Sequence, residues 1–212
     1  KYGSFLWNRL ARVYPLHLAT LLGLVALGLG AGVMGMSIDP NVLSWKTLWA
    51  QLTLTHAWGF IDVAGWNHPS WSISAEWFAY LTFPIFAACA WALHKRPRVA
   101  LGLALAALFG AFAGYRALTG EELTEGTFVG GAIRIVPSFA YGCALYLVWQ
   151  ANLLTNLKLA WGGLAVSLAA IVTASMLWAP DVVTIVLFGP LVLSLAALSR
   201  SENNPLALPG FV

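Results

Sequence analysis

Two arginines near the start of the chain stand at a spacing that suits phosphate binding. Arg9 and Arg12 are three residues apart, so on a helix they share one face. Two guanidinium groups on one face can clamp a phosphorylated ligand through bidentate hydrogen bonds. The alternative is an anchor whose side chains reach lipid headgroups, and spacing alone favours this anchor.

A carboxylate lies inside a long apolar stretch further along the chain. Ser72, Glu76 and Tyr80 recur every fourth residue and would line one face of a helix. Pro84 has no N–H to offer the carbonyl of Tyr80, which leaves a free acceptor near that face. A carboxylate in a membrane span costs roughly 2–3 kcal/mol and usually marks a function or a partner. We expect this face to point into a helix bundle, where it serves either chemistry or a structural hydrogen-bonding network.

Other reactive side chains give weaker signals. Arg134 opens a later apolar stretch and could meet Glu76 at the same depth, either as a substrate contact or as a structural salt bridge. Cys89 and Cys143 lie in apolar runs without metal or disulfide spacing, so we predict buried, hydrophobe-like thiols. No histidine has a carboxylate at triad-like spacing, so we expect structural roles and nominate no catalytic base among His17, His56, His68 and His94.

The elements that position these residues are predicted to be membrane spans. The chain is 60% hydrophobic and 9% charged, whereas a soluble domain carries about 25% charged residues. A transmembrane helix needs about 20 mostly apolar residues. Such runs predict an all-α integral membrane bundle of about six transmembrane helices, at residues 13–36, 71–93, 99–115, 135–149, 159–179 and 182–198.

The first two spans are joined by a more polar, Trp-rich segment over residues 37–70. Trp45, Leu48, Trp49 and Leu52 recur there at helical spacing, with polar residues such as Gln51 between them. This pattern predicts an amphipathic helix that lies in the plane of the membrane interface.

The distribution of basic residues predicts an orientation. If the N-terminal end is cytoplasmic and the spans alternate, 8 of the 11 basic residues fall on the cytoplasmic side, as the positive-inside rule requires. The membrane is then expected to be the inner (plasma) membrane. Arg9 and Arg12 are expected near its cytoplasmic face and Glu76 near the opposite one. No basic patch indicates nucleic-acid binding.

Three stretches carry a resemblance to a known family. Residues 67–84 read NHPSWSISAEWFAYLTFP and resemble the N-x-P-x-W-S-L-S-V-E-x-x-x-Y-L-x-F-P signature of the acyltransferase 3 family. Residues 9–15 resemble its R-x-x-R-I-x-P segment, and Arg134 with Phe139 and Gly142 resembles its R-x-x-x-x-F-x-x-G segment. The residues that match the long signature are Asn67, Pro69, Trp71, Ser72, Ser74, Glu76, Tyr80, Phe83 and Pro84.

The resemblance implies a multi-pass membrane O-acyltransferase. Its donor would be acyl-CoA, often acetyl-CoA, as a co-substrate, with no bound cofactor or metal. Its acceptor would be a hydroxyl of a cell-envelope carbohydrate. Glu76 is implied on the acceptor side as the catalytic carboxylate. Substrate-binding roles are implied for Arg9, Arg12, Asn67, Trp71, Ser72, Ser74, Tyr80 and Arg134.

The resemblance also bears on how much of the protein this chain represents. The family's candidate catalytic histidine lies on a helix before the R-x-x-R segment, and none of the four histidines here occupies that position. We therefore expect one transmembrane acyltransferase domain over residues 1–212, truncated at both ends and inactive by itself.

Two other functions fit the residues. Glu76 and Arg134 could line the pathway of a transporter or flippase of an envelope precursor, without covalent chemistry. No inverted repeat or pair of broken helices favours that alternative. A purely structural membrane subunit would tolerate apolar substitution of the face formed by Ser72, Glu76 and Tyr80.

Overall fold

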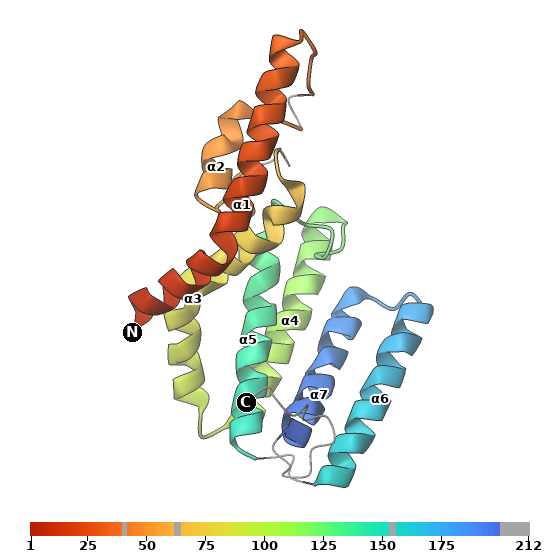
Figure 1. The fold of residues 1–212 in the computed structure, drawn as a ribbon. Helices are drawn as coiled ribbons and strands as arrows, with labels where there is room; N and C mark the ends of the chain where they lie inside the picture. Colours follow the sequence, from red (N-terminus) through yellow and green to blue (C-terminus); the bar gives the residue numbers. More distant parts are fainter. Residues whose placement is uncertain (40–41, 62–64, 153–155, 200–212) are drawn as a thin grey trace. The chain divides into compact units, whose positions relative to one another are not determined.

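The structure, a computed structural model, describes residues 1–39, 42–61, 65–152 and 156–199. Within these ranges it is helical and contains no strand. Figure 1 shows the elements in chain order: α1 (Tyr2–Val33), the 3₁₀ turn η1 (Trp45–Thr47), α2 (Leu48–Leu52), the 3₁₀ turn η2 (His68–Ser70), α3 (Trp71–Leu93), α4 (Pro97–Thr119), α5 (Gly131–Gln150), α6 (Leu157–Met176) and α7 (Asp181–Ser199).

Six helices in the described residues are long and apolar enough to cross a membrane, which confirms the predicted all-α membrane bundle. The predicted second span matches α3 at both ends. The first helix begins at Tyr2, well before the predicted residue 13. Polar residues such as Arg9 and Arg12 end the apolar run but not the helix, because arginine is a good helix former.

The segment predicted to form an interfacial helix contains η1 followed by the five-residue helix α2, and its position in the interface stays a prediction. Trp45 and Trp49 are 52% and 54% exposed, so the aromatic side is available to lipid headgroups. Gln51, expected on the polar face, is instead buried. Its side chain donates to the carbonyl of Gly65 at 3.2 Å and accepts from the hydroxyl of Ser70, which offsets the cost of burial.

The chain divides into two compact units. Unit 1 comprises Lys1–Ile85 and Tyr115–Val136, and unit 2 comprises Phe86–Gly114 and Pro137–Val212. Every site residue nominated from the sequence lies in unit 1. The expectation of a single domain over residues 1–212 stays a prediction.

Unit 1 is held together by hydrogen bonds between segments far apart in the sequence. α1 and α2 lie side by side (Figure 1), with the Tyr14 hydroxyl donating to the carbonyl of Leu52 at 3.0 Å. The start of α5 packs against the segment after α2, where the amide of Ala132 donates to the carbonyl of Ala57 at 3.0 Å. A Cβ on Gly131 would lie 2.8 Å from that same carbonyl oxygen. Only glycine allows this approach.

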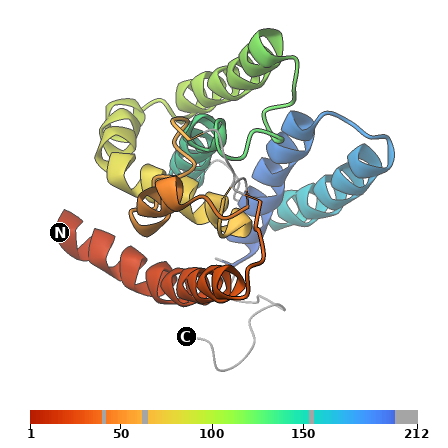
Figure 2. The ribbon, with the colours of Figure 1, turned by 90° about the horizontal axis from the view of Figure 1, so that it is seen from above.

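Unit 2 contains an adjacent helix pair, α6 and α7, which Figures 1 and 2 both show side by side. Where the two helices meet, the buried Ser194 hydroxyl would lie 2.5 Å from a Cβ on Gly163. Large apolar side chains such as Val166 and Val172 are exposed. This distribution is typical of membrane helices, in which small residues allow close packing and large ones face lipid.

The prediction that both cysteines are buried is wrong. Both are free thiols, Cys89 is exposed and Cys143 is half-buried. Their apolar surroundings agree with the sequence, but both cysteines line an open apolar groove, which leaves Cys89 exposed.

Gly131→Ala is expected to destabilise unit 1 by about 1–3 kcal/mol, because the new methyl group would overlap the backbone of Ala57. Gly142→Ala in α5 is the matched control, since a Cβ there meets nothing within 4 Å. It should be neutral or stabilise the helix by up to about 1 kcal/mol. Thermal unfolding of the detergent-solubilised protein measures both. Equal melting temperatures for the two variants would contradict the close approach.

Candidate functional site

The first half of α3 presents three faces to three different parts of unit 1. Ser72, Glu76 and Tyr80 share one face, as their spacing predicts. Ser74 points to the segment that follows α2, and Trp71 contacts Arg134 of α5. The residues of the family signature therefore do not converge on one point.

One of these faces carries a compact charged and aromatic cluster. The Tyr80 hydroxyl donates a hydrogen bond to Oε1 of Glu76. Cζ of Arg9 lies 5.4 Å from the centroid of the Tyr80 ring and 5.3 Å from that of Phe5. The two rings meet edge to face with centroids 5.7 Å apart. The guanidinium is thus held over two aromatic faces, an attraction that strengthens away from water.

The start of α1 is fastened to the middle of α3 close to this cluster. The hydroxyl of Tyr2 lies 2.7 Å from the carbonyl oxygen of Leu81 and 3.2 Å from that of Tyr80. The carbonyl of Tyr80 is the acceptor that Pro84 leaves without a helical donor, so the predicted free acceptor is confirmed. Pro84 leaves this carbonyl accessible, and the Tyr2 hydroxyl approaches it while making its shorter bond to Leu81.

The expectation that the arginine pair and Glu76 lie near opposite membrane faces is wrong. Arg9 touches Tyr80, and Tyr80 binds Glu76, so one side chain separates the guanidinium from the carboxylate. The expectation assumed that the helical run starts at residue 13, whereas α1 starts at Tyr2 and brings Arg9 alongside α3. Arg12, one turn on, is exposed.

Arg134 does not pair with Glu76. Its Nη1 donates to the carbonyl of Thr124 at 2.9 Å, and its Cζ lies 5.0 Å from the centroid of the Trp71 ring. Across the described parts of the chain the only ion pair joins Arg116 to Glu122, at 2.6 Å. Trp71 and Glu76 lie on different sides of α3, so a residue that covers one does not reach the other.

Ser74 is fully buried and bound on both sides. Its hydroxyl donates to the carbonyl of Leu54 at 2.8 Å and accepts from the amide of Ala57 at 3.0 Å. The indole of Trp58 adds a bond to the carbonyl of Ser74 at 3.0 Å. Ser74 therefore fastens the segment after α2 to α3. The predicted contact with substrate would require these bonds to open.

A buried polar network that the sequence does not reveal lies next to the hydrogen bonds of Ser74. His17, Gln51, His56 and Ser70 are each at most 2% exposed. Nε2 of His17 donates to the carbonyl of Gln51 at 2.9 Å, and Nε2 of His56 lies 3.1 Å from the Ser70 hydroxyl. The two imidazole rings are parallel, with centroids 6.1 Å apart. The four residues come from α1, α2, the following segment and η2, so no local pattern joins them.

This network has more acceptors than protons. The single Ser70 proton faces the carbonyl of Asn67 at 2.6 Å, the side-chain oxygen of Gln51 at 3.2 Å and the imidazole of His56. Nδ1 of His17 is buried and has no hydrogen-bond partner among the described residues. Burial lowers the pKa of His56 to about 4, so its ring is neutral at neutral pH.

The remaining nominated residues lie at the start of α3. The Asn67 side chain donates to the hydroxyl of Thr20 at 3.0 Å, which ties η2 to α1. The hydroxyl of Ser72 is exposed and reaches the carbonyl of Pro69 at 3.3 Å. No group of three or more metal-ligating side chains occurs in the part of the chain that the structure describes.

Comparison with known proteins identifies the chain. The profile of the acyltransferase 3 family, described as an acyltransferase domain, matches residues 1–205. This chain belongs to the acyltransferase 3 family. The family predicted from the motifs is therefore confirmed. The role of each site residue stays a prediction.

One curated relative is similar to part of the chain. Acyltransferase MdmB of Streptomyces mycarofaciens is 37% identical over 87 residues, which make up 39% of this chain and 21% of that protein. The matched part is thus about a fifth of the length of the relative. No solved structure matches the chain.

Acid is expected to destabilise unit 1 through His56. The unfolded imidazole binds a proton at its ordinary pKa of 6.5, whereas the folded one does so only at about 4. Stability is therefore complete above pH 6.5 and falls by roughly 3 kcal/mol as the pH drops toward 4. Melting temperatures measured across this range should show less pH dependence in His56→Gln than in wild type. His68→Gln, at an exposed position, should behave as wild type; an unchanged pH dependence in His56→Gln would contradict the assignment.

Ser74→Ala is expected to cost about 1–3 kcal/mol, because it leaves the buried amide of Ala57 and carbonyl of Leu54 without their partner. Ser72→Ala, two residues away and exposed, should change stability by less than about 0.5 kcal/mol. Chemical unfolding of the purified protein distinguishes the two. A small effect at Ser74 would show that the segment after α2 is held mainly by other contacts.

Proposed function

We propose that the protein transfers an acyl group, acetyl in the simplest case, from acyl-CoA to a hydroxyl of a cell-envelope carbohydrate. Family membership and the membrane-spanning helices support an acyltransferase that works in a membrane. The observation that carries the residue assignments is the cluster of Arg9, Tyr80 and Glu76. It joins two separate family motifs in one place.

The arginines suit the donor. Acyl-CoA carries a pyrophosphate, and guanidinium groups bind phosphate oxygens through two parallel hydrogen bonds. Arg12 is exposed and free of ion pairs within the described residues, so it can meet an incoming phosphate. Arg9 is orientated by the rings of Phe5 and Tyr80 before any ligand arrives. Such preorganisation lowers the entropic cost of binding.

Glu76 suits the acceptor. An ionised carboxylate has two oxygens and about four lone-pair sites, and Tyr80 occupies one of them. The rest can accept a hydrogen bond from a carbohydrate hydroxyl and orient it. That hydroxyl oxygen would attack the thioester carbonyl, forming the ester C–O bond and breaking the C–S bond. The proton passes to a base, which the family resemblance assigns to a histidine on a preceding helix, and then to the CoA thiolate.

The other nominated residues form the surroundings of this reaction. Ser72 is exposed one turn before Glu76 and would contact the acceptor. Trp71 and Arg134 stack on one another and would contact the carbohydrate away from the reacting hydroxyl. Asn67 holds η2 to α1 through Thr20 and would act on substrate through that position.

The proximity of Arg9 and Glu76 also changes where the donor and the acceptor are expected to bind. Arg9 and Glu76 belong to one cluster, so the donor phosphates and the acceptor hydroxyl would bind close together within unit 1. The basic segments still favour the plasma membrane with the N-terminal end cytoplasmic. A donor from the cytoplasm would then enter the bundle to reach this cluster.

Acylation of envelope polysaccharide by the full-length protein, supplied with radiolabelled acetyl-CoA, tests the assignments. Glu76→Gln should lower kcat/KM about 100-fold, because the acceptor hydroxyl loses the carboxylate that orients it toward the thioester. Glu121→Gln, an exposed loop carboxylate, is the matched control and should keep full activity. Arg12→Lys keeps the charge but loses the paired N–H donors of the guanidinium. It should therefore raise KM for acetyl-CoA with a smaller change in kcat.

Two outcomes would overturn the proposal. Full activity in Glu76→Gln at equal membrane abundance would remove the carboxylate from the reaction. Movement of carbohydrate across liposome membranes without an acyl donor, with no acylated product when the donor is present, would favour a transporter.

A further inference from the structure

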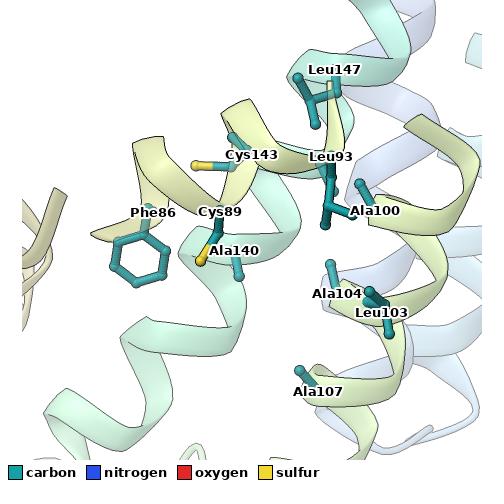
Figure 3. A pocket seen from close by; sticks show the side chains of 12 residues that line it. Phe86, Cys89, Leu93, Ala100, Leu103, Ala104, Ala107, Ala140, Cys143 and Leu147 are labelled. Carbon is teal, nitrogen blue, oxygen red and sulfur yellow. The ribbon is translucent and has the colours of Figure 1, made fainter. Parts of the chain in front are cut away.

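Unit 2 contains an apolar groove that the proposed reaction does not use. Its volume is about 180 Å³, and it is lined by the second half of α3 together with α4 and α5 (Figure 3). Phe86 and Cys89 of α3 face Ala140 and Cys143 of α5 across it, and Ala104 of α4 closes one side. An apolar cavity of about 150 Å³ is enough to bind benzene, so this groove can hold a segment of a hydrocarbon chain.

The groove opens at the surface of a membrane-spanning segment. Cys89 and Leu103 are exposed at its rim, and Leu103 is 57% exposed. The three lining helices are all candidate spans, so the surrounding medium is lipid hydrocarbon rather than water. Alanines of α4 and α5 make up much of the lining, and their small side chains leave the space open.

One end of the groove lies next to a strongly basic turn. Leu93 and Ala100 line the groove, and the turn between α3 and α4 connects them. This turn carries His94, Lys95 and Arg96, and Arg98 follows in the first turn of α4; all four are exposed. None of its lysine and arginine side chains forms an ion pair within the described part of the chain. The cationic side chains of Lys95, Arg96 and Arg98 therefore lie beside one end of the apolar groove.

We propose that this groove and turn bind an anionic diacyl phospholipid, with one acyl chain in the groove and the phosphate on the basic turn. The two features together match the two parts of such a lipid: a flexible apolar chain and a negative headgroup. Basic pockets between membrane helices bind anionic headgroups, whereas a neutral apolar partner would gain nothing from the turn. The lipid would fill the gap between α3, α4 and α5.

Photo-crosslinking tests the proposal on the full-length protein. It is reconstituted in phosphatidylcholine vesicles that contain a trace of phosphatidylglycerol with a photoactivatable diazirine in one acyl chain. A phosphatidylcholine probe with the same chain is run in parallel. Peptide mass spectrometry should find the phosphatidylglycerol probe on residues 86–93 and 140–147, at least about fivefold above the phosphatidylcholine probe. Equal labelling by the two probes would overturn the proposal.

Two pairs of variants separate the headgroup from the chain. Lys95→Gln combined with Arg96→Gln should reduce the phosphatidylglycerol signal to that of phosphatidylcholine, whereas Lys158→Gln, another exposed cation, should not. Ala107→Trp should block the groove and reduce labelling by both probes. Ala106→Trp, its exposed neighbour outside the groove, should leave labelling unchanged.

Two results would contradict the assignment of the groove to a phospholipid acyl chain. Unchanged labelling in Ala107→Trp would show that the chain does not occupy the groove. Displacement of the probe by long-chain acyl-CoA at lower concentration than by unlabelled phosphatidylglycerol would assign the site to the acyl donor instead.

Discussion

Unit 1 depends on a few hydrogen bonds made where water is scarce, above all the two made by the hydroxyl of Ser74. They join α3 to the backbone on either side of Thr55 and His56, at Leu54 and Ala57. A hydrogen bond in a low-dielectric interior is strong, and an unmade one there is costly. Leu54 keeps a left-handed backbone with φ of 56°, which persists only where its surroundings hold it.

The rest of the candidate site follows from this fastening. With the segment after α2 held on α3, His56 reaches Ser70 and Gln51 reaches His17, so α1 is drawn against α2. The start of α1 then runs along α3, where the Tyr2 hydroxyl lies near the carbonyls of Leu81 and of Tyr80, the second of which Pro84 leaves without a helical donor. Arg9 arrives beside Tyr80 and Glu76 as a consequence. A cluster suited to acyl transfer is thus built on bonds that do not themselves take part in chemistry.

Unit 2 obeys a different constraint. Apolar helices in lipid gain nothing from hiding apolar surface, so they associate through close packing of small residues. α6 and α7 achieve this where Ser194 meets Gly163. Between α3, α4 and α5 the alanines leave a groove instead. An acyl chain of a lipid would occupy this groove, and the basic turn at its end would favour a lipid with an anionic headgroup.

The sequence by itself determined the membrane-spanning helices, the family, and the shared face of Ser72, Glu76 and Tyr80. These follow from composition, motif spacing and helical periodicity, which are local properties of the chain. Even the effect of Pro84 could be predicted, because it acts on a carbonyl four residues away. The start of α1 could not be predicted, because hydropathy locates apolar residues and not the ends of helices.

Only the tertiary structure decided which side chains meet. Arg9 was expected far from Glu76 and lies one side chain away, while Arg134 was expected near Glu76 and stacks on Trp71. The buried network of His17, Gln51, His56 and Ser70 gave no signal at all in the sequence. The physical reason is the same in each case. Contacts between residues many positions apart depend on how helices cross and how long segments return, and periodicity along one helix carries no information about its neighbour.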